Sequence, residues 1–317
     1  MIEETAWSDQ ELALQVARLW DPAASCVAHL RSGENSTWAT ALQGRESVLR
    51  LTPGEHRTRN QIEAELDFVE YLADGGLRVA RPVASGSGQR VVEVSQLGSM
   101  GQPGWAAVFE RLHGRHYEYF SRDVDRPLFL LWGRTMGRLH ELSRRFVARE
   151  GCQRPQWWED PVAGCYFSGV SSDDDSLTLR EQLVGWLRRH QAEPGHYGLV
   201  HGDFERTNFL ILNGTIGLFD FDDSCYHWFA WDIACALWVF RNARPAERSR
   251  FLGWFLEGYS AVREPDVERL DGFTDLVRLR TVALVLHRLR NPERFASEPE
   301  SEWVRRTRSW LQSSWSW

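Results

Sequence analysis

The chain has 317 residues, of which 43% are hydrophobic and 26% are charged, and its formal net charge is −7. This composition excludes a disordered or fibrous protein, leaves room for two domains, and argues against nucleic acid as the main partner. Five cysteines without Cys-x-x-Cys spacing argue against a disulfide framework or a zinc site.

All 37 basic residues are arginine, because the sequence contains no lysine. Any position that commonly uses lysine must therefore use arginine, whose planar guanidinium presents a fork of donors instead of a point charge. The chain does not begin with a basic segment followed by an apolar run, and no apolar segment approaches the ~18 residues that span a bilayer. We therefore expect a cytoplasmic protein without a membrane partner.

The first third of the chain combines short strands with two helices. Apolar residues at helical spacing predict helices over residues 8–19 and 57–73, and alternating segments predict strands over 26–30, 36–42, 47–51, 90–94 and 105–112. The polar turn after the first strand contains Ser32 and Gly33, and such a turn can present backbone N–H groups to phosphate, although it can equally be an ordinary hairpin loop. This order predicts an α+β domain over residues 1–112.

The second domain, residues 113–317, is expected to be mainly helical. Helices are predicted over 127–146 and 177–190, and again from Trp228 to the end. Between the first two helices lies an irregular segment, 152–176, that contains Trp157, Trp158, Glu159 and Asp160. Aromatic rings beside carboxylates suit an amine-bearing ligand, and a loop packed across the helices is the alternative.

The segment from His201 to Asp222 carries the strongest chemical signal. Its two strand-like stretches, FLIL and TIGLF, are joined by Asn213-Gly214, a dipeptide typical of a type I′ hairpin turn. Asp203 and Asn208 precede the first strand and Asp220 ends the second, so that three oxygen-bearing side chains are expected at one end of the hairpin. Such a set suits Mg²⁺. The alternative is a surface hairpin with ordinary polar residues.

The motifs HGDFERTN and LFDFD resemble those of the aminoglycoside phosphotransferase/choline kinase family, relatives of the protein kinases. The stretch WGRTMGRLH, residues 132–140, and the stretch WDIA, residues 231–234, are similar to two helices of the same family. Residues 220–234, DFDDSCYHWFAWDIA, are most similar to a bacterial branch of homoserine-kinase-like and stress-response-kinase-like proteins. The resemblance spans nearly the whole chain.

The resemblance implies a two-lobed, protein-kinase-like fold that uses ATP and Mg²⁺. The small N-terminal lobe, with an antiparallel sheet and a helix, would bind the nucleotide, and the larger helical lobe would bind the acceptor. Asp203 would accept the proton of the attacking hydroxyl, Asn208 and Asp220 would hold the metal, and His201 and Asp232 would support the loop. Asp222 would either add to the metal site or cap the next segment. The adenine would contact backbone groups of the hinge residues Phe109, Glu110, Arg111 and Leu112.

Two positions depart from the family's pattern. Arg50 stands where the family has a phosphate-binding lysine, and its expected partner is Glu65, with Glu63 as the second choice. Arginine can bind phosphate oxygens with two donors, so nucleotide binding is retained in this prediction. Glu205 stands where the family commonly has a basic residue. It would either meet a cationic group of the acceptor or pair with the adjacent Arg206.

We therefore expect a small-molecule kinase that phosphorylates a hydroxyl of an aminoglycoside-like antibiotic, an amino alcohol or a hydroxy amino acid. One alternative is a protein or peptide Ser/Thr kinase of the stress-response type. A second alternative is a nucleotide-binding pseudokinase that acts as a scaffold or sensor. Arg50 in place of lysine and Glu205 in place of a basic residue are the features that favour it.

Overall fold

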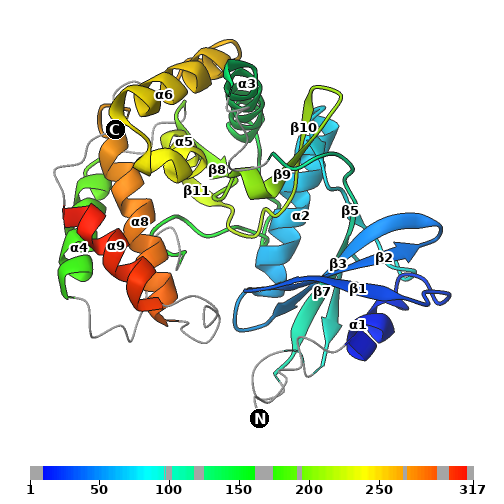
Figure 1. Cartoon of the computed structure of the whole chain (residues 1–317). Helices are drawn as coiled ribbons and strands as arrows, with labels where there is room; N and C mark the ends of the chain where they lie inside the picture. Colours follow the sequence, from blue (N-terminus) through cyan, green and yellow to red (C-terminus); the bar gives the residue numbers. More distant parts are fainter. Residues whose placement is uncertain are drawn as a thin grey trace. The chain divides into compact units, whose positions relative to one another are not determined.

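A computed structural model describes residues 10–95, 97, 102–117, 125–160, 174–190, 195–266, 270–290 and 300–312. Its contacts divide the chain into two compact units, Met1–Gly114 with Val147–Gln153, and Arg115–Phe146 with Arg154–Trp317 (Figure 1). Within the described residues, none of the helices combines the length and the apolar character that a membrane crossing requires.

The first unit is built on an antiparallel sheet in the order β1-β2-β3-β7-β5, with β6 also paired to β7. Its strands are β1 Val27–Ser32, β2 Ser36–Leu42, β3 Arg45–Pro53, β5 Pro82–Val83, β6 Val91–Val94 and β7 Gly104–Glu110, and a further short strand is β4 Arg78–Val79. The predicted strands therefore exist, with ends shifted by a few residues.

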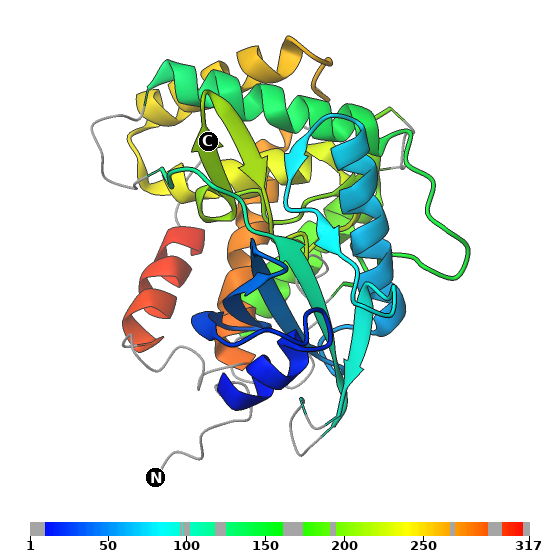
Figure 2. The ribbon, with the colours of Figure 1, turned by 90° about the vertical axis from the view of Figure 1, so that its right-hand side faces the viewer.

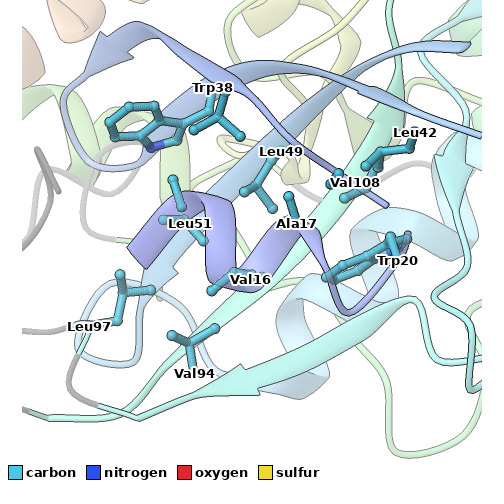
Figure 3. Close-up of a cluster of buried hydrophobic side chains, with 14 residues drawn as sticks. Val16, Ala17, Trp20, Trp38, Leu42, Leu49, Leu51, Val94, Leu97 and Val108 are labelled. Atoms are coloured by element: carbon cyan, nitrogen blue, oxygen red, sulfur yellow. The ribbon is translucent and has the colours of Figure 1, made fainter. Parts of the chain in front are cut away.

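One core of the first unit lies between the sheet and helix α1, Gln10–Ala17. Val16, Ala17 and Trp20 meet Trp38 and Leu49 there, and all five side chains are buried (Figure 3). Along β2 buried residues alternate with more exposed ones, because successive side chains of a strand point to opposite faces of the sheet, and in β3 the residues from Leu49 to Pro53 are all buried. This packing fixes the position of β3, which carries Arg50.

Helix α2, Arg59–Asp74, is the second helix among the described residues of this unit. It begins in a capping box, in which the Thr58 side chain accepts from the Gln61 N–H and the Gln61 side chain accepts from the Thr58 N–H. Its buried face includes Ile62, Leu66 and also Glu65, so a carboxylate is carried on the apolar side of the helix.

The second unit is mainly helical, as predicted. Its helices are α3 Arg126–Ser143, α4 Asp174–Arg188, α5 Phe229–Leu237, α6 Pro245–Ser260, α8 Phe273–Arg290 and α9 Glu300–Gln312, with short 3₁₀ helices η3 Arg206–Asn208 and η4 Trp238–Asn242. Helix α8 packs against α4, α5 and α9, and both views show α9 in red beside α8 in orange (Figures 1 and 2).

Four short strands accompany these helices. β9 Phe209–Leu212 and β10 Thr215–Leu218 form the predicted hairpin, while β8 Tyr197–Val200 pairs with β11 Cys225–Trp228. The second pair was not predicted from the sequence. Residues 201–224, which include the hairpin, connect β8 to β11, so that this segment begins and ends at the same two-stranded sheet.

Candidate active site

The hairpin brings Asn208 and Asp220 to the same end. Leu212 pairs with Thr215 and Phe209 pairs with Leu218 across the ladder, and the Phe219 N–H donates to the Asn208 carbonyl over 3.2 Å. Asn213 and Gly214 have φ values of 51° and 71°, as a type I′ turn requires. Asp220, one residue beyond the pairing, has a left-handed φ of 66°, which is uncommon outside glycine and often marks a functional position.

Asp232, at the start of α5, holds the loop that precedes the hairpin. Its carboxylate accepts from the backbone N–H groups of His201 and Gly202, over 2.9 and 2.8 Å, and from Nε2 of His140 over 3.1 Å. Burial favours the neutral acid, but the hydrogen bonds from His140 and His201 outweigh it, and the pKa of Asp232 lies below its ordinary value. A buried anion thus anchors residues 201 and 202.

The loop also needs glycine at position 202. Gly202 has a φ of +83°, and a Cβ atom there would lie 2.1 Å from the Asp223 carbonyl oxygen. His201 supports the same loop, because its Nε2 donates to the Phe219 carbonyl over 3.2 Å and its Nδ1 accepts from the Asp203 N–H over 3.3 Å. Burial lowers the pKa of His201, so the ring is neutral and serves the backbone.

Asp203 is fixed through both carboxylate oxygens. Oδ2 accepts from Nδ2 of Asn208 over 2.8 Å, and Oδ1 accepts from the guanidinium of Arg280 in α8. Burial raises the pKa of Asp203, and the charge of Arg280 opposes that shift. Because 22% of the Asp203 side chain remains exposed, a hydroxyl group can reach it.

Arg280 was missed in the sequence. It lies 77 residues from Asp203 in the chain, and contacts over such distances are set by helix packing. One signal was present: Arg280 lies two residues before the apolar run of residues 282–286 in α8, and it is buried there with 6% exposure. A buried charge of this kind requires a partner.

The side chains of the hairpin end fit a hard cation. Nδ2 of Asn208 donates to both the carbonyl and the carboxylate of Asp203, so its Oδ1 is the atom left for a metal, and Asp220 adds an exposed carboxylate. The described residues contain no cluster of three or more His, Cys, Asp or Glu side chains arranged for a metal. A site with only a few protein ligands is suited to Mg²⁺, because phosphate groups of the substrate supply further oxygen ligands to the ion.

Asp222 is buried within the turn after β10. Its backbone carbonyl accepts from the guanidinium of Arg154, which also donates to the Ser224 carbonyl over 2.7 Å. Arg154 therefore fixes the backbone of this turn.

In the first unit, Arg50 of β3 forms a bidentate pair with Glu65 of α2, with both N–O distances at 2.7 Å. Both side chains are buried, and the guanidinium also lies 5.0 Å from the ring centre of Phe109. Glu63, the second choice, is instead bonded to Arg90 over 2.8 Å.

The other predicted nucleotide contacts are also in the first unit. The Gly33 N–H donates to the Asn35 carbonyl over 2.9 Å, and Oγ of Ser32 bonds Nε2 of His29 over 2.8 Å, so both groups are used within the turn. In the segment 109–112, the N–H groups of Glu110 and Arg111 donate to carbonyls of Arg81 and Glu46, whereas the N–H of Leu112 bonds no backbone carbonyl within the described chain.

The segment 157–160 divides into buried and exposed residues. Trp157 is 1% exposed and packs against Trp228, with ring centres 5.8 Å apart, and Asp160 is 0% exposed. Trp158 and Glu159 reach solvent. The burial of Trp157 and Asp160 favours the packed loop, which leaves Trp158 and Glu159 as the accessible members of the predicted acceptor group.

Glu205 does not pair with Arg206. Its Oε1 accepts from the Thr207 hydroxyl over 2.7 Å, while the Arg206 guanidinium lies over the ring of Phe240, 5.7 Å from its centre. Of the two alternatives for Glu205, the pair with its neighbour is therefore not formed.

Several known proteins are similar to this chain in sequence and fold. Residues 27–265 match the model described as the phosphotransferase enzyme family. Amicoumacin kinase of Bacillus subtilis (strain 168) is 28% identical over 273 residues, which cover 83% of this chain and 80% of that protein. Homoserine kinases, such as that of Gluconobacter oxydans, are also among the relatives, in agreement with the predicted branch.

Two solved structures are similar over 96% of this chain and 94% of their own. Amicoumacin kinase hAmiN in complex with AMP-PNP, Ca²⁺ and Ami has a TM-score of 0.82 at 26% identity. The microcompartment-associated aminopropanol kinase has a TM-score of 0.74 at 25% identity. These likenesses confirm the predicted kinase-like fold class.

Proposed function

This chain belongs to the phosphotransferase enzyme family, and we propose that it transfers the γ-phosphoryl group of ATP to a hydroxyl of a small molecule. The observation that carries the proposal is the arrangement at Asp203, whose carboxylate is fixed on both oxygens and still partly exposed. A fixed carboxylate that can reach a hydroxyl is suited to orient it and to accept its proton.

The cofactors of this proposal are ATP and Mg²⁺. Asn208 and Asp220 would hold the metal through oxygen atoms, and Arg50 would bind phosphate oxygens of the nucleotide. Mg²⁺, when bound, neutralises charge on the phosphate oxygens. The AMP-PNP and Ca²⁺ in the amicoumacin kinase complex support a nucleoside triphosphate with a divalent cation.

The acceptor class that fits best carries both a hydroxyl and an amine. Glu205 makes no ion pair with Arg206, and Trp158 and Glu159 offer an aromatic face beside a carboxylate, as an ammonium group would require. Aminopropanol and homoserine, named in the relatives, are an amino alcohol and a hydroxy amino acid. Aminoglycoside-like antibiotics complete the proposed range.

A panel of aminoglycosides, amicoumacin, amino alcohols and hydroxy amino acids tests the proposal. The protein is incubated with Mg²⁺ and ATP, with GTP in parallel, and the acceptor is examined by mass spectrometry for one added phosphoryl group. We expect one class to be phosphorylated by the wild-type protein. In Asp203→Asn turnover should fall by ~10²- to 10⁴-fold, the usual contribution of a positioned general base.

The alternatives give different results in the same assay. A phosphoryl group added to protein but not to any small molecule would select the protein kinase. Thermal stabilisation by Mg²⁺ and ATP without any transfer would select the pseudokinase and would contradict the proposal.

A further inference from the structure

Arg280 contacts Asp203 from a different part of the chain. It lies in the middle of α8 and is 6% exposed, and its Nη2 donates to Oδ1 of Asp203 while Asn208 occupies Oδ2. The carboxylate is thereby fixed from two sides. A single donor would leave it free to rotate about its own axis.

The position of Arg280 follows from the packing of α8 on α5. Nε1 of Trp238, just after α5, donates to Oγ1 of Thr281 over 2.9 Å, and that hydroxyl donates to the Val277 carbonyl over 2.7 Å. The residue next to Arg280 is therefore held in place. Because α5 also carries Asp232, one helix anchors both the loop of Asp203 and the helix of Arg280.

The positive charge of Arg280 lies close to several carboxylates of the site. Asp203, Glu205 and Asp223 all interact with it electrostatically, and although burial opposes the cation, the nearby negative groups hold the pKa of Arg280 above its ordinary value. A phosphoryl group in transfer is itself anionic. The loop from His201 to Asn208 offers it little positive charge, because Arg206 is turned to the ring of Phe240.

We propose that Arg280 is a positioning residue of the phosphotransferase reaction. It acts through Asp203: its guanidinium fixes the carboxylate opposite Asn208 and supplies positive charge beside the carboxylates of the loop. This inference rests on the proposed function and adds to it a residue on a distant helix.

Variants of α8 test the role of Arg280. Arg280→Gln removes the charge, Arg280→Lys keeps it without the planar fork, and Arg278→Gln removes a charge from the same helix near Asp275 as the matched control. Because a small misplacement of a reacting group costs ~10²-fold in rate, we expect kcat to fall by about that factor in Arg280→Gln, with KM for ATP within about twofold. Arg280→Lys should be intermediate and Arg278→Gln close to the wild type.

Rescue by small molecules separates this role from a structural one. Added guanidinium chloride at millimolar concentration should restore part of the turnover of Arg280→Gln or Arg280→Ala. Urea, which is planar and similar in size but neutral, should not. A double-mutant cycle of thermal unfolding gives a readout without turnover: Arg280→Gln should change the midpoint less in an Asp203→Asn background than in the wild type.

Three outcomes overturn the assignment. They are an Arg280→Gln protein with the kcat of Arg278→Gln, a loss of turnover that neither guanidinium nor Arg280→Lys restores, and additive effects of the Arg280 and Asp203 substitutions on unfolding. A wild-type protein that phosphorylates no acceptor overturns the proposed function itself, so the two failures are distinct.

Discussion

At the scale of single residues, Arg50 of β3 and Glu65 of α2 form a buried ion pair at the position where the resemblance predicts a lysine and its glutamate. The two side chains are 5% and 1% exposed, and they share two hydrogen bonds of 2.7 Å. Guanidinium matches carboxylate geometry better than ammonium does, which explains how arginine occupies this buried position without loss of the pair.

We predict that Arg50→Met destabilises the protein by ~3–5 kcal/mol, because it leaves Glu65 charged and buried without its partner. The double substitution Arg50→Met with Glu65→Leu should recover most of that loss, since both buried charges are removed. Thermal unfolding of the two variants checks the prediction. Nucleotide-dependent stabilisation should be lost in both, so a double variant that is stable and still responds to ATP would contradict the role of Arg50.

The partner of Arg50, Glu65 or Glu63, could not be predicted from the spacing of apolar residues in α2. Both glutamates lie beside the apolar stripe of α2, and helical spacing alone does not separate them. In the structure Arg90 bonds Glu63, Asp67 and Glu70, which leaves the buried Glu65 to Arg50. That decision depends on β6 and its neighbours, which lie far from α2 in the sequence.

At the scale of elements, helices α3 and α6 pack closely because glycines lie in their interface. A Cβ atom at Gly133 would lie 2.0 Å from the Phe255 carbonyl oxygen, and one at Gly258 would lie 2.2 Å from that of Leu130. Contacts this short involve backbone atoms, so the helices would have to separate to admit a methyl group.

We predict that Gly258→Ala lowers stability by ~1–3 kcal/mol or more, the usual cost of overpacking. Gly253→Ala is the matched control on the same helix, because its Cβ would meet nothing within 4 Å. It should raise stability by ~0.5–1 kcal/mol through helix propensity. Equal unfolding midpoints for the two variants would show that α3 and α6 are not packed this closely.

Some elements are determined by residues close together in the sequence, and others by residues far apart. The hairpin of β9 and β10 was predicted because Asn213 and Gly214 specify their own turn, and α2 because Ile62, Leu66 and Val69 recur at helical spacing. The pair of β8 and β11 was missed, because each strand is four residues long and its partner is more than twenty residues away. The contact of Arg280 with Asp203 was missed for the same reason, as it depends on how α8 packs.

At the scale of the whole molecule, three buried histidines link folding to pH. Burial lowers the pKa values of His140 and His201, and it lowers that of His227 to about 3. The rings are neutral when the protein is folded and take up protons near pH 6.5 when it is unfolded. The unfolded chain therefore binds more protons below pH 6.5, and stability falls as the pH falls from there.

For His227 this loss continues down to about pH 3 and amounts to ~1.4 kcal/mol for each pH unit. His227→Phe keeps an aromatic ring beside Trp231, on which the imidazole is stacked with centres 4.7 Å apart. We predict that the variant loses less stability than the wild type between pH 6.5 and 5, as measured by urea unfolding. An unchanged pH dependence would mean that His227 is not held neutral by the fold.

Phosphoryl transfer to a small molecule is the activity proposed for the whole chain. It is tested most directly by following labelled γ-phosphate from ATP in a reaction that contains the protein, Mg²⁺ and the acceptor found in the panel. We expect the label to appear on the small molecule with the wild-type protein and the rate of transfer to fall by ~10²- to 10⁴-fold with Asp203→Asn. Label that stays on ATP, or transfer that is equally fast in Asp203→Asn, would contradict it.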